Sequence, residues 1–154
     1  MKVVIFNAAD KEYAVNIEKV HEVIRWKEPV PIPEAPDFVE GVINLRGKVI
    51  TLINLRKKLK LGMSEKDVAS RVLIMEIDNH FMGIVVDNVA DVVLIEDVDI
   101  SPPEEVLKRA KYLVGVGKYR KRLIPVMDME KLLTGRDKKS IKTVGKMVEI
   151  RKRD

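Results

Sequence analysis

One segment of this chain recurs 74 residues further on. The residues GVINLRGKVITLINLRKKL at 41–59 align without a gap with GVGKYRKRLIPVMDMEKLL at 115–133. The identical pairs are Gly41 and Gly115, Val42 and Val116, Arg46 and Arg120, Ile50 and Ile124, Lys57 and Lys131, and Leu59 and Leu133. Upstream, residues 11–24 resemble residues 79–93 more loosely, at an offset of about 68. Self-similarity at a nearly fixed spacing predicts two copies of one folding unit.

Each copy contains the signals of short strands, a hairpin and a short helix. Runs rich in β-branched residues predict strands at 3–6, 13–17, 20–24, 71–77, 81–89 and 91–95. Four prolines within residues 28–37 remove backbone donors and predict an ordered extended loop. Asn54 and its counterpart Asp128 can each cap a short helix. Short strands separated by turns favour small closed barrels, because closure hides the strand edges.

The fold class predicted is therefore all-β with short helices, built from two packed five-stranded barrels. We expect the first barrel unit at about residues 1–66 and the second at about residues 67–135, followed by a basic C-terminal tail at 136–154.

Charge is concentrated in that tail. Residues 136–154 hold eight Lys or Arg and three Asp or Glu, which accounts for the whole formal charge of +5. Such a tail is typical of a solvated or partly ordered end, and a contact with nucleic acid or a membrane surface is the alternative. A small barrel that binds nucleic acid usually stacks bases on aromatic residues, which are scarce here. Trp26, between Arg25 and Lys27, can serve a surface contact or pack under the proline loop.

The residues needed for catalysis or metal binding do not gather in the sequence. There is no cysteine, His21 and His80 are isolated, and no glycine-rich phosphate loop occurs. We therefore expect no enzyme activity, no cofactor, no metal and no small-molecule substrate. The first apolar run is too short for a signal peptide or a membrane span, so we expect a cytoplasmic protein with no direct membrane insertion.

The hairpin around Asn44–Gly47 poses the main functional question. Asn at the first position and Gly at the last suit a type I turn closed by a glycine bulge, so Asn44 and Gly47 are the predicted structural turn residues. Leu45 and Arg46 would then be the central residues, held outward. The second copy lacks the Asn and the Gly, so we expect it to lack this turn shape. Arg46 either solvates a turn or is presented to a partner.

The same hairpin carries a family resemblance. GVINLRGKVI with the following NLRKKL segment, preceded by VHEVIRW and PIPEAPDFVEG, resembles the CheW family of chemotaxis coupling proteins over most of residues 1–135. That family usually has Pro where Thr51 stands and Asp where Asn54 stands, and the second copy carries Pro125 and Asp128 at those positions.

The resemblance implies two five-stranded SH3-like barrels with a shared apolar interface and some strand exchange. It implies a non-enzymatic adaptor that bridges the cytoplasmic tip of chemoreceptors to the regulatory domain of the histidine kinase CheA. Such an adaptor would be recruited to receptor arrays at the inner face of the membrane. The competing hypothesis is a small-barrel protein that binds nucleic acid through the basic tail.

The resemblance also assigns residues. Arg46 would be the family's hairpin arginine and Glu22 the acid of its VxEI segment, and a surface ion pair between them would orient the guanidinium. Val20, Gly41 and Val42 would lie on the receptor-facing region. The apolar loop residues Val30 and Ile32 are candidate kinase contacts.

Overall fold

The structure is a computed structural model that describes residues 1–63, 65–104 and 109–141. Its first-half elements are β1 (Lys2–Ala8), β2 (Lys11–Asn16), the 3-10 helix η1 (Ile17–Lys19), β3 (Val20–Arg25), β4 (Val39–Leu45), β5 (Lys48–Asn54) and α1 (Leu55–Lys58). Its second-half elements are β6 (Arg71–Ile77), β7 (His80–Val86), β8 (Asn88–Leu94), the 3-10 helix η2 (Asp97–Asp99), β9 (Ile100–Ser101), β10 (Leu113–Tyr119), β11 (Arg122–Met127) and α2 (Met129–Leu132). The predicted class, mostly strands with short helices, is confirmed.

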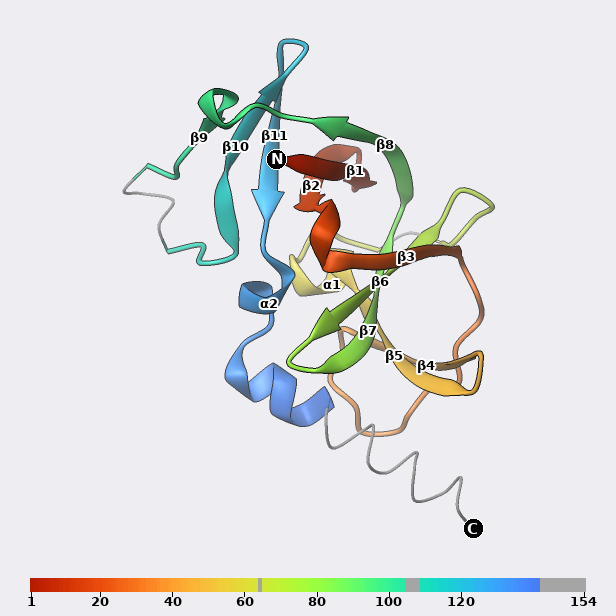
Figure 1. Cartoon of the computed structure of the whole chain (residues 1–154). Helices are drawn as coiled ribbons and strands as arrows, with labels where there is room; N and C mark the ends of the chain where they lie inside the picture. Colours follow the sequence, from red (N-terminus) through yellow and green to blue (C-terminus); the bar gives the residue numbers. More distant parts are fainter. Residues whose placement is uncertain (64, 105–108, 142–154) are drawn as a thin grey trace.

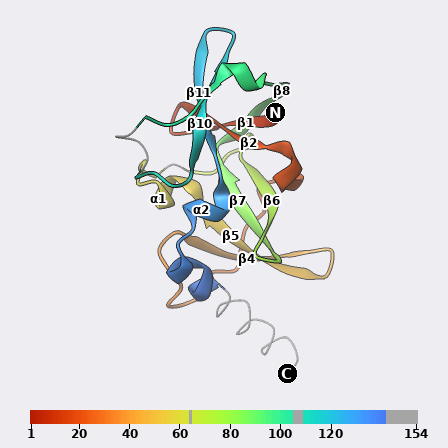
Figure 2. The ribbon, with the colours of Figure 1, turned by 60° about the vertical axis from the view of Figure 1, so that its left-hand side comes forward.

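The described strands form two sheets, and each sheet takes strands from both repeat copies. One sheet has the order β8-β1-β2-β11-β10-β9, and the other has the order β3-β6-β7-β5-β4. Most neighbours are antiparallel, but β11 pairs with β2 and β5 pairs with β7 in parallel. Figures 1 and 2 show the two sheets packed together, with the β10–β11 hairpin projecting at one end. The strand exchange implied by the resemblance is thus present.

Three apolar clusters among the described residues explain why many strand sequences are continuously hydrophobic. On β1, Val3 and Ile5 pack inside their own sheet, whereas Val4 and Phe6 enter a cluster shared with the other sheet. On β6, Val72 and Ile74 line a third cluster inside the second sheet, and their neighbours Leu73 and Met75 enter the shared one. Since side chains alternate between faces, strands buried on both faces need apolar residues at every position.

Within residues 1–63, 65–104 and 109–141, four long hairpins share one turn geometry. Each has a two-residue loop in which both residues have positive φ, as in a type I′ turn whose twist matches that of paired strands. The φ angles are 52° and 62° for Ala9 and Asp10, 49° and 85° for Arg46 and Gly47, 50° and 64° for Asp78 and Asn79, and 48° and 65° for Arg120 and Lys121.

Both predicted helix caps are confirmed. Asn54 Oδ1 accepts a hydrogen bond from the Lys57 N–H at 3.0 Å. Asp128 Oδ1 accepts from the Glu130 N–H at 2.9 Å and from the Lys131 N–H at 3.3 Å. These side chains satisfy donors that the first turn of a helix leaves free.

The first part of the predicted tail is docked on the domain. Residues 135–141 are helical, and Ile141 is 4 % exposed within the shared cluster. Asp137 accepts a bond from Lys58 Nζ at 2.5 Å and exchanges bonds with Thr134 across the helix start. The remaining tail, residues 142–154, lies outside the described residues.

A partly buried ion pair ties α1 to the end of β7 and to the first hairpin. Arg56 donates to both carboxylate oxygens of Asp87, with Nη2 to Oδ2 at 2.5 Å, and the Ala9 N–H donates to the same carboxylate at 2.9 Å. Burial alone would raise the pKa of Asp87, but these hydrogen bonds outweigh burial and hold the pKa below its ordinary 3.8.

We expect Asp87→Asn to lower the free energy of unfolding by about 1–3 kcal/mol at pH 7, because Arg56 loses a charged partner. A depressed folded pKa gives stability that is present above about pH 4 and is lost as pH falls through the folded value. Urea unfolding at several pH values should show the gap between wild type and variant closing below about pH 4. Asp99→Asn, in exposed η2, is the control, and a gap that persists in acid would contradict this role.

Candidate functional site

The β4–β5 hairpin forms where predicted, but its turn is of another type. Leu45 pairs with Lys48 as the last residue of β4, so the two central residues are Arg46 and Gly47. The predicted type I turn with Leu45 and Arg46 at its centre is wrong. Asn44 Oδ1 nevertheless accepts a bond from the Gly47 N–H at 2.8 Å, so Asn44 and Gly47 do stabilise the turn.

The second copy makes the same turn, contrary to expectation. Arg120 has φ 48° and Arg46 has φ 49°, although Lys121 stands where Gly47 does. The register of β10 with β11 demands positive φ at both loop positions, and non-glycine residues adopt it at a cost of roughly 1–2 kcal/mol each. The two arginines therefore have the same backbone conformation and differ in their surroundings.

The surroundings of Arg46 differ from those of Arg120 because Arg46 forms an ion pair with Glu22. Glu22 lies on β3, the outer strand of its sheet, after a bulge between Val20 and Glu22. Arg46 Nη2 donates to Glu22 Oε1 in a short ion pair, with the Arg46 side chain 67 % exposed and that of Glu22 27 % exposed. Arg120 instead lies over the ring of Tyr119, with Cζ 5.2 Å from the centroid. The pair holds the guanidinium above the outer strand while leaving it open to solvent.

A hollow of about 270 Å³ lies beside this pair. Its lining residues are His21, Glu22, Leu45, Arg46, Lys48, Ile50, Ile74 and Phe81. The His21 and Phe81 rings lie 4.9 Å apart, and Lys48 Nζ is 4.7 Å from the Phe81 centroid. No sequence motif joins His21, Lys48 and Phe81 to Arg46, because these three residues lie on β3, β5 and β7. The only local signal was their place within or beside predicted strands.

The other residues assigned by resemblance lie in different settings. Val20 is partly buried against the shared cluster and pairs with Met75. Gly41 and Val42 are buried, because Val30 bridges to Val42 with two backbone hydrogen bonds of 2.8 and 2.9 Å. Val30 itself is 65 % exposed, and Ile32 is partly exposed. The structure thus joins Gly41 and Val42 to the loop that carries Val30, and joins Arg46 to Glu22.

Gly41 is needed for that loop contact. It has φ 141°, and a Cβ atom built there would lie 2.3 Å from the Val30 carbonyl oxygen. Trp26 has a related structural place: it packs against the cluster inside its sheet, with Lys66 Nζ 5.2 Å from its ring centroid. The sequence left open a surface contact or a packing role for Trp26. The structure shows Trp26 packed against this cluster.

Within the described parts of the chain, no set of three or more His, Cys, Asp or Glu residues is placed to hold a metal ion. No helix among those residues has the length and apolar character to cross a bilayer. The described surface offers an exposed arginine at the turn of the β4–β5 hairpin, a hollow beside it and the exposed apolar loop residue Val30.

Comparison with known proteins places this double-sheet module in a family. The family model described as CheW-like domain matches residues 2–137. The chemotaxis protein CheW of Klebsiella aerogenes is 33% identical over 144 residues, which cover 92% of this chain and 87% of that protein. The CheW of Bacillus subtilis is 33% identical over 134 residues, covering 86% of each.

A solved structure of a related protein also matches this fold. The scaffolding protein TtCheW from Thermoanaerobacter tengcongensis superposes with a TM-score of 0.81 at 35% identity, covering 88% of this chain and 89% of that one. The chain belongs to the CheW family. The resemblance found in the sequence is confirmed, and these relatives give no support to the nucleic-acid hypothesis.

Proposed function

We propose that this chain is a non-enzymatic adaptor that couples chemoreceptors to the histidine kinase CheA. The observation that carries the proposal is the ion pair between Glu22 and Arg46 on an exposed hairpin. An exposed pair of this kind contributes only about 0–1 kcal/mol to stability. Its geometry is better explained by orienting a guanidinium for a partner than by folding.

The receptor tip is the proposed partner of the hairpin face. Arg46 presents donors beside the hollow lined by His21, Lys48 and Phe81, and β3 continues this face with Val23, which is 41% exposed. An arginine next to aromatic and apolar side chains is the composition of protein-interface hot spots. A receptor segment bound here would pair a carboxylate or backbone carbonyl with Arg46 and bury an apolar side chain against the hollow.

The regulatory domain of CheA is the proposed partner of the Val30 loop. Val30 is exposed while its backbone is fixed by the bridge to Val42, and Ile32 is two residues further along the same loop. An exposed apolar side chain on an ordered loop loses little conformational entropy on binding. The loop and the hairpin tip are separate features, so one chain can hold both partners at once.

The proposal predicts a ternary complex. We expect the purified chain to bind a CheA regulatory domain and a chemoreceptor-tip fragment together, with the three components eluting as one species in size-exclusion chromatography. Val30→Asp should remove the kinase domain but keep the receptor fragment, because the hairpin is untouched. Val68→Asp, which alters a residue 95% exposed elsewhere on the surface, is the matched control. A folded chain that binds neither partner would refute the adaptor function.

A further inference from the structure

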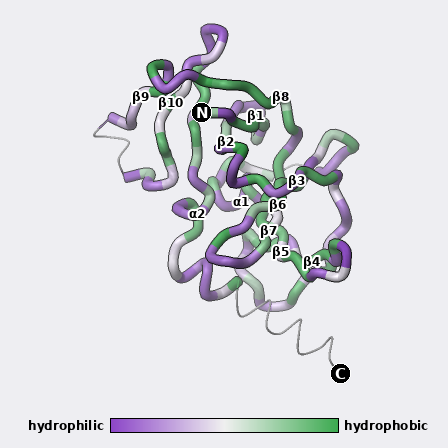
Figure 3. The backbone as a smooth tube through the Cα atoms, viewed as in Figure 1, coloured by the Kyte–Doolittle hydropathy of each residue, from purple (hydrophilic) through white to green (hydrophobic). Residues whose placement is uncertain are grey.

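Positive charge gathers at the tip of the β10–β11 hairpin. Residues 118–122 have the sequence KYRKR, so four of these five residues are cationic. Lys118, Arg120 and Lys121 are exposed, and they form no ion pair within the described residues. Figure 3 shows the tip as hydrophilic, and Figures 1 and 2 show it projecting at the end of the molecule opposite the β4–β5 hairpin. The tip is therefore a cationic surface separate from the candidate site.

Formation of the turn does not explain these charges. Arg120 and Lys121 both have positive φ, at 48° and 65°. An Asn-Gly pair closes such a turn at lower cost, because Asn and Gly adopt positive φ more readily. Neighbouring like charges also repel one another over roughly the 8–10 Å screening length of physiological salt. Residues that both the backbone and the charges disfavour point to a role other than folding.

Tyr119 holds two guanidinium groups of the tip in place. Its ring packs against the apolar cluster inside the sheet that contains β1 and β11. The Cζ atoms of Arg120 and Arg122 lie 5.2 and 5.7 Å from the ring centroid, within the range of cation–π contacts. Side chains that are held in this way lose less conformational entropy when they bind a ligand.

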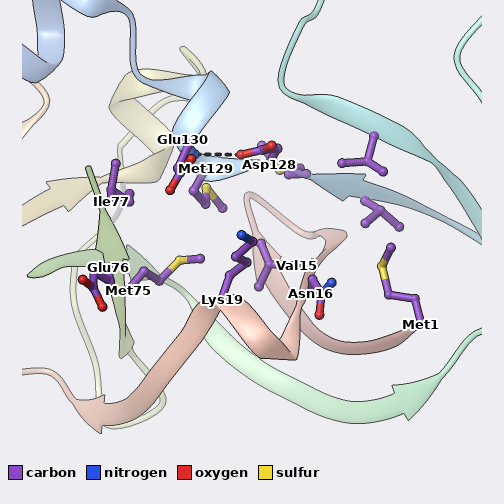
Figure 4. Close-up of a pocket in the computed structure, with 13 residues that line it drawn as sticks. Met1, Val15, Asn16, Lys19, Met75, Glu76, Ile77, Asp128, Met129 and Glu130 are labelled. Carbon is purple, nitrogen blue, oxygen red and sulfur yellow. Dashed lines mark hydrogen bonds between the residues drawn. The ribbon is translucent and has the colours of Figure 1, made fainter. Parts of the chain in front are cut away.

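The other end of the hairpin is fixed in the core. Ile124, two residues from Arg122, is 0% exposed, and Met127 at the end of β11 is 3% exposed. Figure 4 shows the continuation of the chain where the two sheets meet, with Met129 extending inward and a hydrogen bond between Asp128 and the next turn. The cationic tip thus projects from an ordered base.

The tip already binds one carboxylate of its own chain. Arg122 Nη1 donates to Glu12 Oε2 at 2.9 Å, from β11 to the neighbouring strand β2. Guanidinium groups bind carboxylates through charge-assisted hydrogen bonds, which are stronger than neutral ones. Lys118, Arg120 and Lys121 remain for carboxylates from elsewhere.

A second basic run, RKKLK at 56–60, shows the contrast. There Arg56 donates to Asp87 and Lys58 donates to Asp137, both at 2.5 Å. The fold itself therefore supplies carboxylates to two cations of that run, whereas the hairpin tip receives one carboxylate for four cations.

We propose that the tip of the β10–β11 hairpin binds an acidic segment of another protein. Carboxylates of that segment meet Arg120 and Lys121, and an apolar side chain beside them contacts Leu123. Leu123 is 71% exposed and lies directly opposite Lys118 in the strand register. An apolar contact next to the cations favours a protein segment over a simple anion, which has no apolar group. This contact goes beyond the proposed adaptor function and needs neither of its partners.

Fluorescence anisotropy of the full chain with a labelled peptide tests the proposal. The probe is a fluorescein-labelled peptide with glutamates on both sides of one leucine. We expect binding that weakens as salt screens the charges. Arg120→Gln with Lys121→Gln should weaken it by about tenfold or more, because two charge-assisted contacts are lost. Arg25→Gln with Lys60→Gln removes the same residue types from exposed positions elsewhere and should bind as the wild type does.

Glu12→Gln should change the affinity in the opposite direction. It frees Arg122 for the peptide, so we expect binding to tighten by about three- to tenfold. A partly exposed pair of this kind contributes little to stability, so the variant should fold. Glu18→Gln removes an exposed acid elsewhere and should leave the affinity unchanged.

Absence of peptide binding by the wild type would overturn the proposal, and so would equal binding by Arg120→Gln with Lys121→Gln or an unchanged affinity after Glu12→Gln. Binding to vesicles of anionic phospholipid but not to the peptide would also overturn it. The basic tail at 136–154 is present in every variant, so its charge does not produce these differences. Thermal melts would be recorded beside the titrations to show that each variant is folded.

Discussion

Arg46→Ala should leave the fold nearly intact while weakening the coupling of receptor to kinase by about tenfold or more. Exposed turn substitutions usually change the free energy of unfolding by less than about 0.5 kcal/mol. Alanine also meets the same positive-φ cost as arginine, so the turn strain cancels. The coupling loss would come from the missing guanidinium, which is the group that Glu22 orients. Binding to a receptor-tip fragment and to a CheA regulatory domain would be measured beside thermal melts.

Arg120→Ala is a closely matched control, because it changes the same residue type at the same turn position with φ 48°. We expect it to leave coupling unchanged. Glu22→Ala should reduce coupling as Arg46→Ala does, and the double variant should be no worse than either, which would mark one shared element. A folded Arg46→Ala protein that couples normally would make Arg46 a residue that only solvates its turn.

Gly41→Ala should have the largest effect on folding of any change proposed here. A Cβ atom at this position would lie 2.3 Å from the Val30 carbonyl oxygen, so the bridge between Val30 and Val42 must break or the loop must move. The φ of 141° is also unfavourable for alanine. From the clash and the backbone strain together, we expect a loss of about 3 kcal/mol or more in the free energy of unfolding. Urea denaturation would measure it.

Gly47→Ala separates the cost of the clash with Val30 from the cost of the positive φ angle. Gly47 also has positive φ, at 85°, but a Cβ atom there meets nothing within 4 Å. We expect it to cost about 1 kcal/mol, from backbone strain alone. Equal losses for the two variants would mean that the contact with Val30 contributes nothing. Where Gly41→Ala still folds, binding of the CheA regulatory domain should weaken, because the loop that carries Val30 has lost its anchor.

Local features were predictable because their causes are local. Asn54 and Asp128 cap helices since a side-chain oxygen reaches donors only two or three residues away. The hairpin at Asn44–Gly47 could be located for the same reason. Its turn type could not, because the pairing of Leu45 with Lys48 is fixed by the strands, whose faces must each meet the right cluster.

The candidate site was predictable only in part. Arg46 and Glu22 were identified through a family resemblance, and they lie 24 residues apart in sequence. His21, Lys48 and Phe81 carry no motif, and they meet Arg46 because β3, β5 and β7 lie in one sheet. The burial of Gly41 depends on where the proline loop crosses β4, which the prolines alone do not specify.

By itself, the sequence determined that one strand-rich segment occurs twice, because residues 41–59 align with residues 115–133 without a gap. Only the tertiary structure decided that β1 and β2 of the first copy join the sheet of β8 to β11, while β6 and β7 join that of β3 to β5. Backbone hydrogen bonds are the same for any sequence, so two similar copies offer nearly equivalent strand edges. The exchange is decided by packing, since it is this arrangement that places Val4, Phe6, Leu73 and Met75 in one shared cluster.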